Sequence, residues 1–381
     1  MPVFEKRLTE FLTKDKGRVK LAQPARELNN ILSKEAIFGA IPSQRRKLST
    51  DLSTLQARYD EAQPELLQLE DQKKQMYSQM LLRIEKSKNQ IRRIIIAHFR
   101  EVSNKIPAWV QDFKPKSSLG FPTKGRVRRV TDEIVDFVST KVKEDFKIWN
   151  EQVLVPLIEE KAEYIYESSE KDLKALFNLI DSIDAQLSGK AIVVNTASGW
   201  ERAAGLAVMY LGSISGGTYM LVNGFNLKGI VKSVALDIGV GTGLVLLGMT
   251  NPVLAIGAAI VVIWRIIAGG TADALATIKS KIGNTICDSI NGMASEKSDQ
   301  IAEDIEHKYT EIANMALEGI DIRLNAVREE TEKILEEKRK GQQHADERNA
   351  VINKCEEKLK VICEKLDTLV FELAGLSSTA N

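Results

Sequence analysis

The residues best suited by type to do chemistry are a glycine cluster and three histidines, and neither group forms a site. The cluster Gly239-Val240-Gly241-Thr242-Gly243 has the glycine density of a loop that cradles phosphate, but Leu244-Val245-Leu246 follows where GxxxxGK[ST] requires a lysine. His98, His307 and His344 lie far apart without HExxH spacing, so neither metal chemistry nor nucleophile activation is indicated. We therefore predict no catalytic residue, no metal site and no cofactor in this chain.

Cysteine usage and charge exclude further classes of function. The three cysteines have no CxxC spacing, which argues against a zinc site or a disulfide framework, and Cys355 lies on an apolar helical stripe where we expect a small buried side chain. Lys and Arg number 53 against 52 Asp and Glu, a net charge of +1. The densest basic stretch, residues 124–129, is therefore better explained as a solvated helix start or an assembly contact. No nucleic-acid partner is expected.

One long segment is apolar in a chain that is otherwise dense in Lys and Glu. Between residues 203 and 264 only Lys228, Lys232 and Asp237 are charged, so the segment needs a membrane or a buried docking site. Its charge-free part, residues 238–264, would be long enough for one transmembrane helix of about 20 residues. Asn251-Pro252 interrupts it, because the residue before a proline is pushed out of the helical region. We predict two helices, each roughly 18 Å long, that form a hairpin in one leaflet.

Glycine density and border residues favour a membrane site over an ordinary core. Glycine recurs through the segment, as in helices that pack closely in lipid, and tryptophan and arginine stand at its borders, where they favour the membrane–water interface. The alternatives are a hydrophobic subdomain packed on itself or on another subunit, and burial against the bundle with release to lipid. The predicted lipid contacts, including two lysines for anionic headgroups, are Trp200, Lys228, Lys232, Leu244, Leu246, Leu247, Met249, Val253, Leu254, Ile256, Trp264 and Arg265.

The segment before the apolar stretch has the pattern of long packed helices. A first helix is expected over residues 4–33, ending before a break at residues 38–42. From residue 45 to residue 107 apolar residues recur at alternating steps of four and three, which is typical of a helix in a bundle or coiled-coil seam. We expect Pro64 to kink this helix without ending it.

Helical patterns continue on both sides of the apolar stretch. A third helix is expected over residues 127–187, bent near Pro156, and a return helix over residues 271–373, weakened at Gly319 and Gly341. Pro64, Gly319 and Gly341 are the candidate hinges. The end of the return helix keeps a seven-residue repeat of Ile352, Cys355, Leu359, Ile362, Leu366, Leu369 and Leu373.

These patterns together predict an all-α protein. Its expected form is an elongated antiparallel helical bundle or coiled coil with an apolar helical-hairpin membrane tip. The predicted divisions are residues 1–187 for the first part of the helical stalk, residues 188–270 for the membrane-binding part and residues 271–381 for the return helices.

The order of these parts resembles the helical stalk and membrane paddle of bacterial dynamin-like proteins. The resemblance covers nearly the whole chain, and its most distinctive stretch is residues 187–270. The motifs that carry it are Pro64-Glu65 in the long helix, Leu187-Ser188-Gly189-Lys190, Gly199-Trp200, the glycines from Gly212 to Gly217, Gly224-Phe225, Gly239-Val240-Gly241 and Asn251-Pro252.

The resemblance implies a membrane-binding, self-assembling module that remodels or fuses membranes under GTP control. Members of the family carry a GTPase domain, which has no counterpart here, so the chain is expected to be a fragment or one half of a split gene. GTP and Mg²⁺ are then implied only for that other domain, and this chain alone is not expected to hydrolyse GTP.

The expected partners are the lipid bilayer and either further copies of this chain or a paired dynamin-like GTPase chain. The charged N-terminal stretch lacks the apolar core of a secretory signal, so we expect a cytoplasmic protein bound peripherally at the inner membrane face. The alternative function is an α-helical pore-forming toxin subunit, which also joins a long bundle to one apolar hairpin. Dye release from liposomes by the chain alone would distinguish the toxin.

Overall fold

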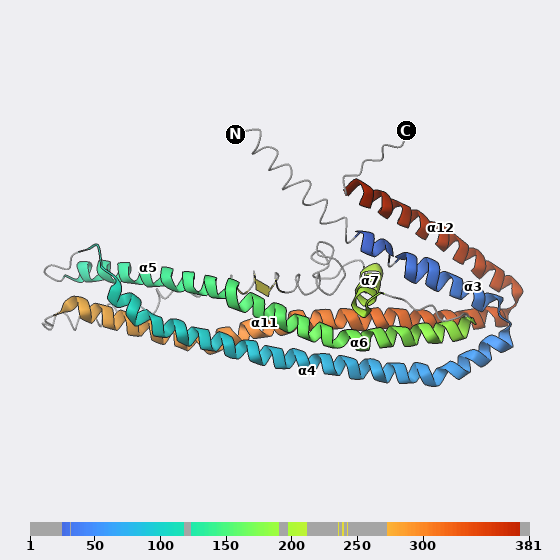
Figure 1. The fold of residues 1–381 in the computed structure, drawn as a ribbon, viewed down its shortest axis with the longest axis horizontal. Helices are drawn as coiled ribbons and strands as arrows, with labels where there is room; N and C mark the ends of the chain where they lie inside the picture. The colour runs from blue at the N-terminus through green and yellow to red at the C-terminus, as the bar shows by residue number, and fades with distance from the viewer. Residues whose placement is uncertain are drawn as a thin grey trace. The chain divides into compact units, whose positions relative to one another are not determined.

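The protein is all-α wherever the structure describes it. The structure is a computed structural model that describes residues 25–30, 32–117, 123–189, 197–211, 235, 238, 239, 242 and 273–373. In these ranges every element is a helix (Figure 1). In chain order the elements are the π-helix η2 (Leu32–Ala40), α3 (Ile41–Ser49), α4 (Leu52–Asp112), α5 (Lys124–Trp149), the π-helix η3 (Asn150–Leu154), α6 (Val155–Ser188), α7 (Gly199–Leu211), α11 (Ala274–Lys340) and α12 (Gln342–Leu373). The predicted fold class is confirmed.

The chain forms two compact units. Unit 1 consists of residues 1–83, 162–233 and 310–381, and unit 2 of residues 84–161 and 234–309. Helices α4, α6 and α11 each contribute residues to both units. The predicted division of the chain at residues 188 and 271 stays a prediction, because most of the segment between them lies outside the described residues.

In unit 1, α4 packs through the predicted apolar row. Lys73 stands where this row is interrupted, and it forms an ion pair with Asp321 of α11. A charged residue in the seam is thus tolerated because it has a partner on the neighbouring helix. The residues of the row that are buried in unit 1 are Leu55, Tyr59, Ala62, Leu66, Leu69, Met76 and Met80.

The break predicted at residues 38–42 is wrong. The π-helix η2 continues directly into α3, and the helical path is interrupted only after Ser49. Pro42 is the second residue of α3, and because proline has no N–H, a carbonyl one turn earlier in η2 lacks its helical donor. The start signal for α4 is Asp51, whose Oδ1 accepts hydrogen bonds from the backbone N of Thr54 at 2.8 Å and from Ser53 Oγ at 2.7 Å.

The predicted return helix is broken at Gly341. Gly341 has φ +119°, a backbone conformation that residues other than glycine rarely adopt. Helix α11 ends at the residue before it. After this break α12 folds back beside η2 and α3 (Figure 1). Asn29 Nδ2 donates to Asp367 Oδ1 at 2.6 Å, and Arg45 donates to Asn353 at 2.7 Å.

Only part of the predicted seven-residue repeat on α12 is buried. Of the repeat, Ile352 is buried, Leu359 and Leu366 are half-buried, and Ile362 and Leu369 are exposed. Cys363 and Val370 are also buried, and neither belongs to the predicted repeat. The prediction that Cys355 is buried is wrong, because α12 packs on its neighbours with a face rotated away from this residue.

In unit 2, α4 packs against α5 and α11. Lys88 of α4 pairs with Glu306 of α11 at 2.6 Å, and Lys105 pairs with Asp145 of α5 at 2.9 Å. The third helix, predicted to bend near Pro156, is divided by the π-turn η3, which ends at Leu154. Because proline has no N–H, the carbonyl one turn before Pro156 has no α-helical hydrogen bond to keep. The backbone can therefore form a wider turn at this point.

Candidate functional site at the ends of the apolar segment

The apolar segment begins in α7, and α7 is docked on α6 and α11 within unit 1 (Figure 1). The Trp200 indole is fully buried. Its Nε1 donates to the carbonyl oxygen of Tyr166 at 2.9 Å, and the two rings meet edge to face at 5.0 Å. Ala203 and Ala207 on the same helix are buried as well. The beginning of the segment is therefore part of the protein core in this structure.

The first turn of α7 is fully capped. Ser198 Oγ accepts from the backbone N of Glu201 at 3.0 Å, and Glu201 Oε2 accepts from the backbone N of Ser198 at 3.1 Å, which is a reciprocal capping box. The carboxylate of Glu170 on α6 accepts from the backbone N of Gly199 at 2.8 Å and of Trp200 at 3.2 Å. An anionic group at a helix N-terminus also stabilises the helix dipole. The pattern Ser-Gly-Trp-Glu was the sequence signal for this start.

A buried network of charges ties α7 to three other helices. Arg202 of α7 binds Asp181 of α6 through two contacts of 2.9 and 3.1 Å. Arg323 of α11 contacts Asp181 at 3.3 Å and Asp184 at 3.1 Å. Lys47 of α3 reaches the same Asp184 at 2.6 Å. These side chains are distributed over α3, α6, α7 and α11. Charge-assisted hydrogen bonds are directional, so the network fixes the orientation of α7 as well as its position.

The pKa of Asp184 reflects this network. Burial raises the pKa of the carboxyl, but the charges of Lys47 and Arg323 and the hydrogen bonds from Lys47 and Ser43 outweigh burial and lower the pKa from 3.8 to about 2. Asp184 is therefore ionised at neutral pH, where it compensates two buried cations.

Two glycines allow α7 to approach its neighbours closely. A Cβ at Gly319 of α11 would lie 2.6 Å from the Cα of Ala203, and a Cβ at Gly199 would lie 2.6 Å from the Cβ of Leu173 on α6. Both distances are shorter than non-bonded carbons tolerate. Gly319 lies inside the continuous helix α11, where close packing accounts for a glycine, and its role as a hinge stays a prediction.

Gly319→Ala is expected to destabilise the protein, whereas Gly292→Ala in the same helix is expected to stabilise it. Alanine favours a helix over glycine by about 1 kcal/mol, but at Gly319 the added methyl group meets the backbone of Ala203, and overpacking of this kind costs about 1–3 kcal/mol. At Gly292 nothing lies within 4 Å of the new Cβ. Chemical denaturation of both variants measures the difference. Equal stabilisation by both substitutions would contradict the α7 contact.

Within unit 2, Gly239 of the apolar segment contacts η3 and the residue that follows it. Gly239 is buried, and a Cβ there would lie 2.7 Å from Cγ2 of Val155, so only glycine fits this contact. The carbonyl oxygen of Gly239 accepts from Nδ2 of Asn150, the first residue of η3, at 3.3 Å. Ala235, Ile238 and Thr242 are buried too, and their spacing defines one helical face.

The structure describes one of the twelve predicted lipid contacts, Trp200. It is a core residue here, so contact with lipid requires this end of α7 to leave α6, and its lipid role stays a prediction. Of the predicted hinges, Pro64 lies within the continuous helix α4, and Gly341 lies at the break between α11 and α12. The other predicted contacts lie outside the described residues: Lys228, Lys232, Leu244, Leu246, Leu247, Met249, Val253, Leu254, Ile256, Trp264 and Arg265.

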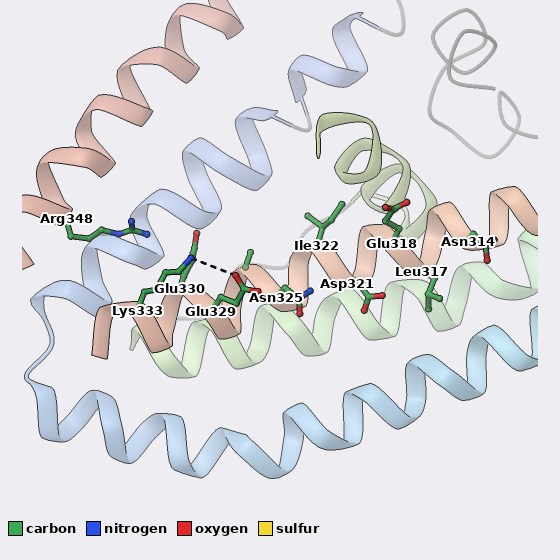
Figure 2. Close-up of a pocket in the computed structure, with 11 residues that line it drawn as sticks. Asn314, Leu317, Glu318, Asp321, Ile322, Asn325, Glu329, Glu330, Lys333 and Arg348 are labelled. Atoms are coloured by element: carbon green, nitrogen blue, oxygen red, sulfur yellow. Dashed lines mark ion pairs between the residues drawn. The ribbon is translucent and has the colours of Figure 1, made fainter. Parts of the chain in front are cut away.

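A polar groove of about 740 Å³ runs along α11 in unit 1, with Arg348 of α12 at one end (Figure 2). Three of its carboxylates have partners: Asp321 pairs with Lys73, Glu329 with Lys333, and Glu330 accepts from Gln44. We assign the groove no chemistry. Within the described ranges no group of three or more His, Cys, Asp or Glu side chains is placed to hold a metal ion. In the same ranges no helix has both the length and the apolar character needed to cross a bilayer.

The fold and the docked segment define an all-helical stalk module that carries an apolar insertion. The family model of the bacterial dynamin-like protein helical domain matches residues 1–350, and the chain belongs to this family. A search among curated proteins gives no match. The resemblance seen in the sequence is thereby confirmed for the helical region.

Proposed function

We propose that this chain is the stalk and membrane-binding paddle of a dynamin-like GTPase that remodels or fuses membranes. The observation that carries the proposal is an apolar segment, with three charged residues between positions 203 and 264, within the part of the chain that matches the helical domain of this family. A segment of this composition gains free energy by leaving water, at roughly 25 cal/mol for each Å² of apolar surface removed. A bilayer at the inner face of the cell membrane is the proposed partner.

The proposed GTPase domain lies outside this chain, either elsewhere in a longer protein or on a partner chain. GTP and Mg²⁺ belong to that domain in this proposal, and the helical units transmit its motion to the paddle. Assembly takes place through further copies of the chain or through the paired GTPase chain. No residue of this chain is assigned to nucleotide chemistry.

Charged substitutions in the apolar segment test the membrane role. The variant Leu246→Glu/Leu254→Glu is expected to weaken co-sedimentation with phosphatidylserine-containing liposomes at least about tenfold, because a charged side chain in the hydrocarbon region costs on the order of 3 kcal/mol. The matched control is Leu67→Glu/Leu82→Glu, which places the same charges on side chains of α4 that are 64% and 66% exposed. The control is expected to bind as the parent does. Equal binding by both variants would contradict the proposal.

A further inference from the structure

Among the described residues, the contact between η3 and Gly239 has fewer polar bonds than the α7 dock. The bond from Asn150 to the Gly239 carbonyl is 3.3 Å long, and the buried Oδ1 of Asn150 has no hydrogen-bond partner among the described residues. A buried acceptor without a partner costs about 1–3 kcal/mol. Gly239 has no side chain of its own to bury. The α7 dock, in contrast, has a fully buried Trp200 and a two-contact ion pair.

The turn that holds this contact is itself unusual. In η3 the backbone N of Val155 bonds to the carbonyl oxygen of Asn150, five residues earlier, and such π-turns are rare and frequently occur at functional sites. The turn presents the Asn150 amide to the segment, and Val155 directly follows it to form the wall against Gly239. The chain therefore keeps a local irregularity at the place where it holds the middle of the apolar segment.

Docking at η3 and insertion into lipid use the same residues. The buried face formed by Ala235, Ile238, Gly239 and Thr242 overlaps the start of the charge-free stretch 238–264. Because this stretch enters the bilayer as one hairpin in the proposed function, its insertion draws Gly239 away from η3. An equilibrium between two exclusive sites shifts toward whichever site binds the segment better.

We propose that η3 is a latch that holds the apolar segment at Gly239 and lowers its affinity for membranes until the latch opens. This inference rests on the proposed membrane function. The latch side consists of Asn150 and Val155, and the segment side is the notch at Gly239. Release at this point frees the hairpin while the α7 dock keeps the beginning of the segment attached to unit 1.

A reversible disulfide across the notch tests the latch. A Cβ built at Gly239 lies 3.9 Å from the Cβ of Val155, within the range of about 3.5–4.5 Å that disulfides span. Val155→Cys/Gly239→Cys is made in a chain whose natural cysteines are replaced by alanine or serine, and co-sedimentation with phosphatidylserine-containing liposomes is measured before and after reduction. The oxidised form is expected to bind at least about tenfold more weakly than the same protein after reduction. The cysteine-free parent serves as the control for the reducing agent.

The outcomes separate the latch from the membrane function. Equal binding of the oxidised and reduced forms would overturn the latch and leave the membrane function standing. If the cysteine-free parent fails to bind liposomes at all, the membrane function is wrong, and the latch falls with it.

A second variant weakens the latch without touching the apolar segment. Asn150→Asp places a carboxylate against the carbonyl oxygen of Gly239 and is expected to raise liposome binding several-fold. The matched control is Asn325→Asp at an exposed position of α11, which is expected to leave binding unchanged. Binding of Asn150→Asp that is no tighter than that of the control would count against the latch.

Discussion

Replacing Asp184 with alanine is expected to lower the free energy of unfolding of unit 1 by about 3–5 kcal/mol, because it leaves the buried Lys47 without its counter-ion and removes one of the two carboxylates that Arg323 contacts. Lys47 is only 1% exposed, and its Nζ lies 2.6 Å from the carboxylate. Arg323 and Ser43 would lose their contacts with the same group, at 3.1 and 2.7 Å. Chemical denaturation, together with hydrogen exchange of the amides of α3, measures the loss.

Asp71→Ala is the control for this substitution. Asp71 pairs with Lys74 across 3.8 Å on the surface of α4, where both side chains are more than 70% exposed, so removing it is expected to change stability by less than about 1 kcal/mol.

The pH dependence of stability is a second test of the role of Asp184. The pKa of Asp184 is lower in the folded protein than its ordinary 3.8, so the carboxylate stabilises the fold above pH 4, and this contribution disappears as the pH falls toward 2. The difference between Asp184→Ala and the parent should therefore shrink over this range; a constant difference would show that the charge is not the cause.

Trp200→Ala is expected to release α7 from unit 1. A fully buried tryptophan contributes about 3–5 kcal/mol relative to alanine, and this one also donates the hydrogen bond to Tyr166. Arg202 is 2% exposed in the docked helix, so trypsin reaches the bond after it only when α7 leaves. The variant should be cleaved after Arg202 much faster than the parent, as mass spectrometry of the fragments would show.

Trp200→Phe is the matched variant for this experiment. It keeps an aromatic ring in the same space and loses the Nε1 donor, so it is expected to be cleaved at an intermediate rate. If Trp200→Ala leaves the bond after Arg202 as resistant as in the parent, the tryptophan does not hold α7 in place.

Features that repeat along one helix were predictable from the sequence. The row from Leu55 to Met80 is buried as expected, because a helix in a bundle must bury an apolar residue at every step of three or four. The irregularity near Pro156 was predictable for a similar reason, since proline removes a backbone donor wherever it stands inside a helix. The start of α4 was missed although Asp51 carries a capping signal, because the Gly-Ala-Ile-Pro stretch at the junction of η2 and α3 is a stronger signal for a break.

The α7 dock was not predictable, because its partners are far apart in the chain. Gly319 contacts Ala203, and Arg323 meets Asp181 on a helix 142 residues earlier. Nothing in the spacing of these residues connects them. The pairing of Trp200 with Arg202 was interpreted as a membrane border from residue type alone, whereas the structure gives both side chains partners inside unit 1.

Co-sedimentation with phosphatidylserine-containing liposomes, by the chain with and without residues 238–264, tests the central claim most directly. The account predicts that the intact chain binds the vesicles without releasing an encapsulated dye, and that the shortened chain stays in solution. Unchanged binding after the deletion would contradict the claim that this segment is the membrane-binding element, and dye release by the intact chain alone would identify a pore-forming protein instead.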